Sequence, residues 1–314
     1  MNNNASDFDG SNVEPDGQLP RPFSSLIDVD VFAISDQGRV RKNNEDHYLV
    51  VRGGRSLETV FSNLAKNQPG DPFEETAYAM VVADGVGGEA AGEVASEQAI
   101  FGLLNLSLRT PDWQFRWGPV QKNTVMWRMQ DRFRLVNAAL VQQATAHAAL
   151  RGMCTTMTAA LSHGKDLIIC HIGDSRAYLF RRGRLEQLTR DHTLFERLLD
   201  DGVNPQDDHL LRELRNVLMQ ALGANESDCQ PDVHDYLLED GDKLLLCTDG
   251  LTDMVDNSKI ESVLGEENSA QSATRNLIDL ALRNGGRDNV TVIVARYSIP
   301  QVSMGKDSRD PSLA

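Results

Sequence analysis

The sequence predicts an α+β domain with antiparallel sheets that are covered by helices. Two observations favour this class. Short apolar segments separated by tight turns occur in groups, as in β-hairpins, and the long segments with helical periodicity occur in pairs. Strands and helices therefore do not alternate one by one, as they would in a parallel βαβ sheet.

The first half of the chain is predicted to hold three strands and then two long helices. Apolar and β-branched residues predict the strands at 29–35, 48–51 and 78–83. Residues 53–76 contain the sequence Gln-Pro-Gly-Asp-Pro and are predicted to form a loop with room for one short helix. Helical periodicity predicts the two helices at 90–108 and 120–150.

The second half is predicted to begin with a meander of short antiparallel strands over residues 155–188. Apolar segments alternate there with turns at Gly164, Gly173 and Gly183. The strongly charged residues 192–216 are predicted to be helical or irregular. Strands at 236–238, 243–248 and 290–297 and helices at 258–264 and 270–283 complete the predicted elements.

The overall composition limits the classes of partner and location. The chain has 31 Lys and Arg against 46 Asp and Glu, a net charge of −15, so we expect no nucleic acid and no membrane surface as partner. Four cysteines without a CxxC pair favour a reducing, cytoplasmic location. The polar residues 1–26 are expected to be a disordered leader, and residues 299–314 a flexible tail.

Acidic residues stand at the ends of several predicted strands. Asp84, Asp174 and Asp249 follow apolar strands, whereas Asp288 and the pair at 45–46 precede them. Strand ends can meet at one sheet edge, where carboxylates repel each other unless a cation binds them. All-oxygen ligands favour hard ions such as Mg²⁺ or Mn²⁺. Taken alone, each aspartate is more simply explained as a cap of a helix or turn.

Six short motifs then occur in one order. They are Arg41-Lys42-Asn43-Asn44-Glu45-Asp46, Val82-Ala83-Asp84-Gly85-Val86-Gly87-Gly88, Gly152-Met153-Cys154-Thr155-Thr156, Ile172-Gly173-Asp174-Ser175-Arg176, Cys247-Thr248-Asp249-Gly250-Leu251-Thr252-Asp253 and Gly286-Arg287-Asp288-Asn289-Val290-Thr291. With them, residues 28–298 resemble the metal-dependent protein phosphatases (the PPM family, or type 2C phosphatases) in their bacterial form. The resemblance implies one catalytic domain over residues 27–298, folded as a four-layer α-β-β-α sandwich of two antiparallel sheets flanked by helix pairs.

The resemblance also implies the roles of individual residues. Asp84 is expected to bridge two metal ions. Gly85 would be a ligand through its carbonyl. Asp249 and Asp288 would complete the first metal site, and Glu45 would be the acidic ligand of the second.

Further roles follow from the same resemblance. Asp46 is expected to orient metal-bound water, and Arg41 to bind the substrate phosphate with its planar donor group. Asp174 and Asp253, together with Asp249, resemble a weaker third metal site. Residues 193–216 resemble the mobile flap beside the catalytic cleft. Val86 stands where many eukaryotic members have a histidine, which leaves the acid for the leaving group open.

The implied activity is hydrolysis of phosphoserine and phosphothreonine in proteins by a metal-activated water, without a covalent phosphoenzyme. Two or three divalent cations, Mn²⁺ or Mg²⁺, would be the cofactors. A serine/threonine kinase and its phosphorylated substrates would be the partners. Two alternatives stay open: a regulatory module that binds phosphoproteins without hydrolysing them, and a phosphatase of another phosphorylated regulator or a small phosphomonoester.

Some residues of types that often carry function are expected to be structural here. His47 and His192 have no second histidine at ligand spacing. Trp113, Trp117 and Trp127 are expected to pack a helix onto a sheet rather than to contact a partner.

Overall fold

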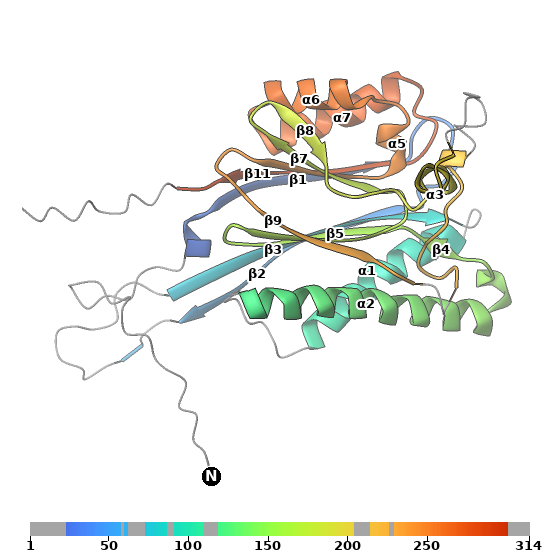
Figure 1. Ribbon diagram of the computed structural model, residues 1–314, viewed down its shortest axis with the longest axis horizontal. Helices are drawn as coiled ribbons and strands as arrows, with labels where there is room; N and C mark the ends of the chain where they lie inside the picture. The colour runs from blue at the N-terminus through green and yellow to red at the C-terminus, as the bar shows by residue number, and fades with distance from the viewer. Residues whose placement is uncertain are drawn as a thin grey trace, which may run out of the picture.

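The protein is described here by a computed structural model over residues 23–57, 60–61, 73–86, 91–109, 119–203, 214–225 and 229–300. Two antiparallel sheets lie face to face, and helices cover the outer face of each sheet (Figure 1). This architecture confirms the predicted α+β class and the four α-β-β-α layers.

The first sheet has five strands in the order β1-β11-β10-β7-β8. Their bounds are β1 (Asp28–Asp36), β7 (Arg176–Arg181), β8 (Arg184–Gln187), β10 (Lys243–Cys247) and β11 (Val290–Ser298). β11 pairs with β1 on one side and β10 on the other. Its residues from Val290 to Ala295 are all buried, which is why this strand has an almost continuous apolar sequence.

The second sheet has six strands, five of them in the order β2-β3-β5-β6-β9. Their bounds are β2 (Asp46–Leu57), β3 (Phe73–Val86), β4 (Cys154–Thr155), β5 (Met157–His163), β6 (Asp166–Ile172) and β9 (Asp232–Leu237). The short β4 pairs with the end of β3.

The pairing of β2 with β3 corrects the loop predicted over residues 53–76. Residues 53–57 and 73–76 are strand. Arg55 and Glu75 face each other across this ladder and form an ion pair of 2.5 Å. Such a cross-strand pair stabilises a sheet although the segment is polar and contains two glycines.

Pairs of helices cover the two sheets (Figure 1). The long helices are α1 (Ala91–Arg109) and α2 (Pro119–Ala146) on the six-stranded sheet, and α6 (Asn257–Glu266) and α7 (Ala270–Arg283) on the five-stranded sheet. The short ones are α3 (Leu194–Asp200), α5 (Asp249–Thr252) and the 3-10 helices η2 (Phe23–Leu26) and η3 (Ala148–Leu150).

Helix α7 shows why these segments are helical. Its buried residues recur with helical spacing at 270, 273, 274, 277, 278 and 281. The Ser269 side chain accepts a hydrogen bond from the backbone N–H of Ser272 and so caps the first turn. The helix therefore has the bounds predicted from its periodicity.

Apolar side chains fill three separate layers. Phe133 and Ile168 belong to the layer between the six-stranded sheet and its helices, whereas Leu277 and Val292 belong to the layer under α6 and α7. The third layer lies between the sheets and includes Ile169 and Ile293. Adjacent residues of one strand therefore pack into different layers, because successive side chains of a strand point to opposite faces of the sheet.

The predicted meander over residues 155–188 is wrong in one respect. The β5–β6 hairpin belongs to the six-stranded sheet, and the β7–β8 hairpin belongs to the other. The chain crosses between the sheets at Gly173, whose φ of +111° is a left-handed conformation that favours glycine. A Cβ at this position would also overlap the Thr156 side chain. The crossing places Asp174 between the two sheets.

Several other predictions meet the structure only in part. Residues 1–22 of the predicted leader and 301–314 of the predicted tail lie outside the described residues, and the 3-10 helix η2 occupies 23–26. Of the predicted flap, residues 204–213 are also outside them. Trp127 is 60% exposed on α2, so the prediction that it packs against the sheet is wrong. Trp113 and Trp117 lie outside the described residues.

All four cysteines are free thiols. In the described part of the chain, no helix is both long enough and apolar enough to cross a membrane.

Candidate metal centre

The centre of the site is a pair of aspartates on neighbouring strands. Asp46 begins β2 and lies directly opposite Asp84 on β3. Residues opposite each other in an antiparallel pair point to the same face of the sheet. That face is turned toward the other sheet, because Asp46 Oδ2 accepts hydrogen bonds from Thr248 Oγ1 at 2.8 Å and Thr291 Oγ1 at 2.7 Å.

The five-stranded sheet brings two more aspartates to the same place. Asp249 follows β10 and is the first residue of α5. Asp288 stands just before β11, and its Oδ2 accepts a hydrogen bond of 2.6 Å from Arg41. Gly250 lets α5 lie close to β11, because a Cβ there would overlap the Asn289 carbonyl oxygen.

These carboxylates are close enough to perturb one another. The pKa of Asp46 is raised to about 7, mainly by burial; the charges of Asp249 and Asp288 add to the rise, and the hydrogen bonds from Thr291 and Thr248 oppose it. Burial and the charges of Asp46, Asp249, Asp174 and Asp288 also raise the pKa of Asp84 well above its ordinary value. A group of carboxylates with this mutual repulsion is stable in ionised form only beside a cation.

Within the described part of the chain, two oxygens of the cluster are buried without a hydrogen-bond partner. They are Asp46 Oδ1 and Asp249 Oδ1, one from each sheet. A buried carboxylate oxygen without a partner is costly, and a hard cation is the partner that such oxygens suit. Among the described residues, no three His, Cys, Asp or Glu side chains surround a single point in the arrangement of a metal site. The chemistry of the donors nevertheless fits divalent cations.

Glu45 and Gly85 meet beside the first turn of α1. The backbone N–H of Gly85 donates to the Glu45 carbonyl over 3.2 Å. A Cβ placed on Gly92 would lie 2.5 Å from Glu45 Oε2 and 2.9 Å from the Gly85 carbonyl oxygen. The Glu45 carboxylate and the Gly85 carbonyl oxygen therefore converge beside the first turn of α1.

Threonines of the Gly152–Thr156 motif hold Asp84 in place through its backbone. Thr155 Oγ1 and the Thr156 N–H both donate to the Asp84 carbonyl, at 2.7 and 2.9 Å. Thr156 Oγ1 accepts from the Asp84 N–H at 3.1 Å. The sequence alone indicates no role for this motif, and the structure identifies it as a support for Asp84.

Asp174 and Asp253 extend the cluster. Burial and the charge of Asp191 raise the pKa of Asp174 to about 7. Burial also raises the pKa of Asp253, while the charge of Arg176 opposes the rise. Arg176 itself is held by a bidentate contact of 2.8 and 2.6 Å to Asp191.

Asn289 is a site residue that sequence reasoning missed. Its Oδ1 accepts from the Glu45 N–H, and its Nδ2 donates to the carbonyls of Gln37 and Asn43, each over 2.8 Å. It is 4% exposed and fixes the segment that carries Arg41 and Glu45. The only signal for Asn289 in the sequence was its position in the Gly286–Thr291 motif. Sequence reasoning also missed Thr248 and Thr291, because their partner Asp46 is 202 and 245 residues away along the chain.

The two histidines expected to be structural make structural contacts. His47 Nδ1 lies 2.8 Å from Ser96 Oγ. His192 contacts Gly173 and Asp232. Neither residue donates a ring nitrogen to the carboxylate cluster in these contacts.

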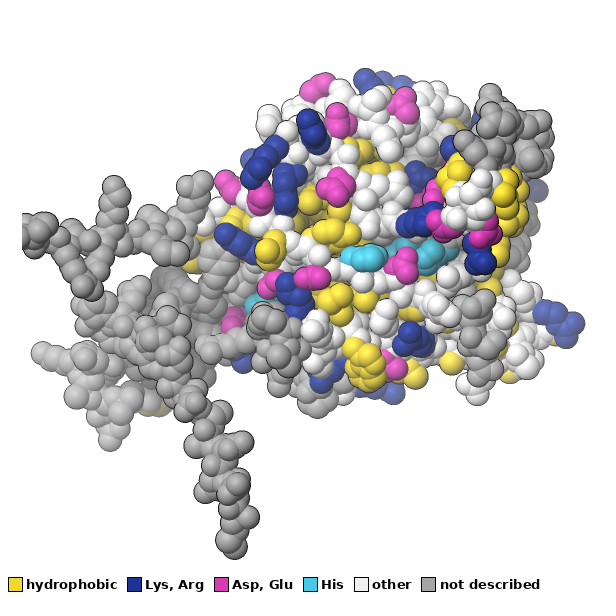
Figure 2. All heavy atoms as spheres, in the orientation of Figure 1, with side chains coloured by type: hydrophobic (Ala, Val, Ile, Leu, Met, Phe, Trp, Pro, Cys, Tyr) yellow, Lys and Arg dark blue, Asp and Glu magenta, His cyan; other side chains and the backbone are white. Residues whose placement is uncertain are grey.

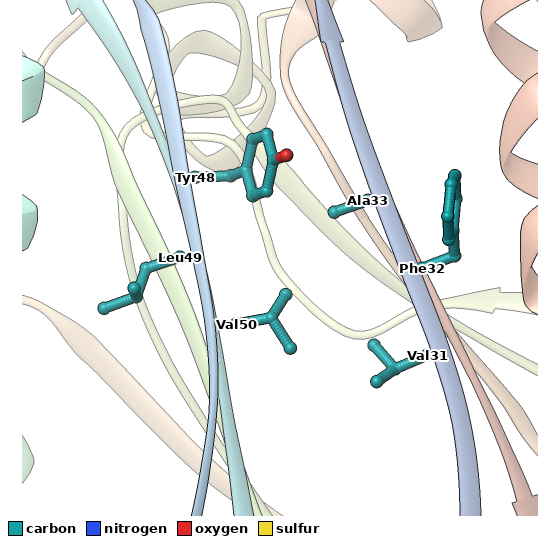
Figure 3. Close-up of a pocket in the computed structure, with 6 residues that line it drawn as sticks. All are labelled: Val31, Phe32, Ala33, Tyr48, Leu49 and Val50. Atoms are coloured by element: carbon teal, nitrogen blue, oxygen red, sulfur yellow. The ribbon is translucent and has the colours of Figure 1, made fainter.

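A cavity of about 340 Å³ lies apart from the carboxylates, between β1 and β2. Figure 3 shows Val31, Ala33, Tyr48 and Val50 pointing into it from the two edge strands. Its lining is apolar except for the Tyr48 hydroxyl. It has no group that could bind a phosphate or a cation, so we do not place the site there.

The two-sheet fold and its carboxylate cluster match the class that the six motifs resemble, the metal-dependent phosphatases, and comparison with known proteins gives the family. The family model described as Protein phosphatase 2C matches residues 72–279. The chain belongs to the protein phosphatase 2C family.

Two bacterial phosphatases are among the relatives of the chain. It is 38% identical over 264 residues to the serine/threonine protein phosphatase PstP of Mycobacterium tuberculosis, covering 84% of this chain and 44% of PstP. The chain thus spans less than half the length of that relative. It is 33% identical over 274 residues to the serine/threonine phosphatase Stp of Listeria monocytogenes, covering 87% of this chain and 97% of Stp.

Solved structures agree with this assignment. The crystal structure of the M. tuberculosis phosphatase PstP matches with a TM-score of 0.67 at 34% identity, over 86% of this chain and 99% of that one. A second structure is the PstP catalytic domain in complex with two manganese ions, with a TM-score of 0.65 at 33% identity, over 87% of this chain and 99% of that one.

Proposed function

We propose that this chain hydrolyses phosphoserine and phosphothreonine in proteins with the help of divalent cations, Mn²⁺ or Mg²⁺. The observation that carries the proposal is the cluster of partly buried aspartates from both sheets, with Asp46 Oδ1 and Asp249 Oδ1 buried and unpartnered among the described residues. The relatives named as serine/threonine phosphatases support the substrate class.

The proposed ligands come from four different parts of the chain. Asp84, Asp249 and Asp288 would hold one cation, and a second cation would be held by Asp84, Glu45 and the Gly85 carbonyl, which lies beside Glu45. Bound cations would supply Lewis acidity, neutralise phosphate oxygens and lower the pKa of water. The protein contributes the spacing, since the Asp46–Asp84 register and the Gly85–Glu45 contact fix these oxygens on the rigid sheets.

Asp174 and Asp253 would form a third cation site with Asp249. The charges of Asp174 and Asp253 add to the effect of burial in raising the pKa of Asp249, which supports the proximity of the three carboxylates. This site lies where the chain crosses between the sheets, at the base of the segment proposed to be a flap, residues 193–216.

Arg41 is proposed to bind the substrate phosphate. Its side chain is 54% exposed, and its guanidinium lies at the edge of the cluster against Asp288. A planar guanidinium can donate two parallel hydrogen bonds to phosphate oxygens, which a lysine cannot. The charge on the phosphate would thus be met by Arg41 on one side and by the cations on the other.

Asp46 is proposed to orient water rather than to ligate a cation directly. Two threonine hydroxyls bind one of its oxygens and leave Oδ1 directed to the interior. A carboxylate with a fixed orientation can accept a proton from water at a defined position. The partners proposed for the protein are a serine/threonine kinase and its substrates. A cytoplasmic location also stays a prediction.

Hydrolysis of paired peptides tests the proposal. One peptide carries phosphothreonine and the other carries phosphotyrosine in the same sequence, each with Mn²⁺ and with EDTA. We expect Mn²⁺-dependent release of phosphate from the phosphothreonine peptide, lost in Asp84→Asn. Asp279→Asn is the matched control, because Asp279 is 59% exposed on α7. Equal turnover with EDTA, or of Asp84→Asn, would overturn the proposal.

A further inference from the structure

His192 makes more contacts than a surface residue at the start of a loop requires. Its backbone N–H donates to the Gly173 carbonyl over 2.7 Å, and its Nδ1 accepts from the Gly173 N–H over 3.2 Å. Both backbone groups of Gly173 are therefore bound by one residue. Gly173 directly precedes Asp174, so His192 determines where the turn that carries Asp174 lies.

The opposite side of the imidazole is held by β9. His192 Nε2 lies 3.1 Å from Asp232 Oδ2, and the ring packs at 4.9 Å against the ring of buried His171. Since Nδ1 accepts a hydrogen bond, the proton of the neutral ring belongs on Nε2, which donates to Asp232. The tautomer and the ring orientation are thus both determined by the contacts. Figure 2 shows histidine side chains gathered below α3, beside acidic and basic groups.

The same residue closes the base of residues 193–216. The His192 carbonyl accepts from the Met219 N–H over 2.7 Å, and the Leu194 N–H donates to the Val217 carbonyl over 2.8 Å. Thr193 forms a β-bridge with Leu218 between these bonds. The two ends of the segment are therefore joined at His192.

We infer that His192 is a positioning residue that holds Asp174, a proposed ligand of the third cation, on the joined base of residues 193–216, with Asp232 as its support. The inference rests on the proposed function. Loss of the bond from Gly173 to Nδ1 would let the Asp174 turn move. It would weaken cation binding by Asp174 without displacing Asp84 on β3 or Asp249 at the start of α5.

Direct titration with Mn²⁺ tests the inference, with free Mn²⁺ followed by electron paramagnetic resonance. His192→Gln places its amide near Nε2 and loses the bond from Gly173, whereas His192→Asn keeps an acceptor near Nδ1. His234→Gln is the matched control, since His234 is exposed two residues beyond Asp232 on β9. We expect His192→Gln to weaken the weakest Mn²⁺ site about fivefold, the factor of one neutral hydrogen bond, and His192→Asn to bind like the wild type.

A double-mutant cycle separates positioning from general damage. In an Asp174→Asn background, His192→Gln should have no further effect on Mn²⁺ binding. Wild-type binding by His192→Gln, or an equal further loss in the Asp174→Asn background, would overturn the inference. If His192→Gln does not fold, Asp232→Leu at a 45% exposed side chain replaces it with the same two criteria. A wild type that binds Mn²⁺ without turnover would refute the proposed function alone, because this test reads binding.

Discussion

Replacing Asp46 by asparagine should make the cation-free protein more stable at neutral and alkaline pH. Asp46 is 4% exposed, and burial raises the pKa of its carboxyl to about 7. In the unfolded chain the same carboxyl titrates near its ordinary value of about 3.9. As pH rises from about 4 to 7, the unfolded state loses its proton first, so the free energy of unfolding falls until both states are ionised.

The size of the effect follows from the two pKa values. At about 1.4 kcal/mol for each pH unit, the rise of the pKa from about 4 to about 7 gives a cost of about 4 kcal/mol above pH 7, and about 1–2 kcal/mol at pH 5. Asparagine does not titrate. Its buried N–H₂ without a partner costs about 1–3 kcal/mol, independent of pH. The stability of Asp46→Asn relative to the wild type should therefore increase by about 2–3 kcal/mol from pH 5 to pH 8.

Urea unfolding of both proteins with EDTA, at pH 5 and pH 8, measures this difference. Asp242→Asn is the matched control, because Asp242 is 1% exposed but paired with Arg181 at 2.7 Å, and breaking that pair should reduce stability at both pH values. The reasoning would be refuted by a difference between Asp46→Asn and the wild type that is the same at pH 5 and pH 8.

Three further substitutions test the supports of the site. Asn289→Ala loses three hydrogen bonds and should lower the free energy of unfolding in urea by about 2–4 kcal/mol; a loss below about 0.5 kcal/mol would contradict the role given to Asn289. Gly250→Ala should lower the thermal midpoint of unfolding, because its Cβ would overlap the Asn289 carbonyl oxygen. The control Gly265→Ala should keep or raise the midpoint, because its Cβ would meet Phe180 at an ordinary 3.5 Å. Equal midpoints for the two variants would contradict the packing argument. Arg41→Lys should lower kcat/KM on a phosphothreonine peptide about tenfold while changing stability by less than about 1 kcal/mol, since the pair with Asp288 is exposed; unchanged kcat/KM would contradict phosphate binding.

Helices and strands could be predicted where the local pattern of apolar residues is enough to identify them. The amphipathic spacing of α7 and the apolar run of β11 need no distant partner to be recognised. The outer halves of β2 and β3 could not be predicted, because Gly53, Gly54 and several polar residues resemble a loop. They form strands because residues 53–57 pair with residues 73–77, and the local sequence does not show such pairing.

The sequence also does not show which strands belong to which sheet. Two hairpins joined by the turn at Gly173 fit a single meander as well as they fit a crossing. The crossing itself depends on the left-handed conformation of Gly173 and on its close approach to Thr156. A glycine in a turn has several explanations in sequence, and this one depends on the packing of both sheets.

The carboxylates of the site could be predicted, but their supports could not. Aspartates at strand ends are visible as a pattern, and the structure brings Asp46, Asp84 and Asp249 together as expected. Thr248 and Thr291 are ordinary strand residues until the sheets bring them to Asp46. Which residues hold a ligand in place depends on distant hydrogen bonds, and one sequence does not show them.

The central claim is that carboxylates from both sheets act together on a phosphoester through divalent cations. The most direct test is the Mn²⁺ dependence of phosphate release from a phosphothreonine peptide by the EDTA-treated wild type and by Asp249→Asn. We predict saturable activation of the wild type by Mn²⁺ and a loss of about a hundredfold or more in Asp249→Asn. Undiminished release by Asp249→Asn, or a wild type that binds Mn²⁺ and releases no phosphate, would contradict the claim and favour a regulatory module.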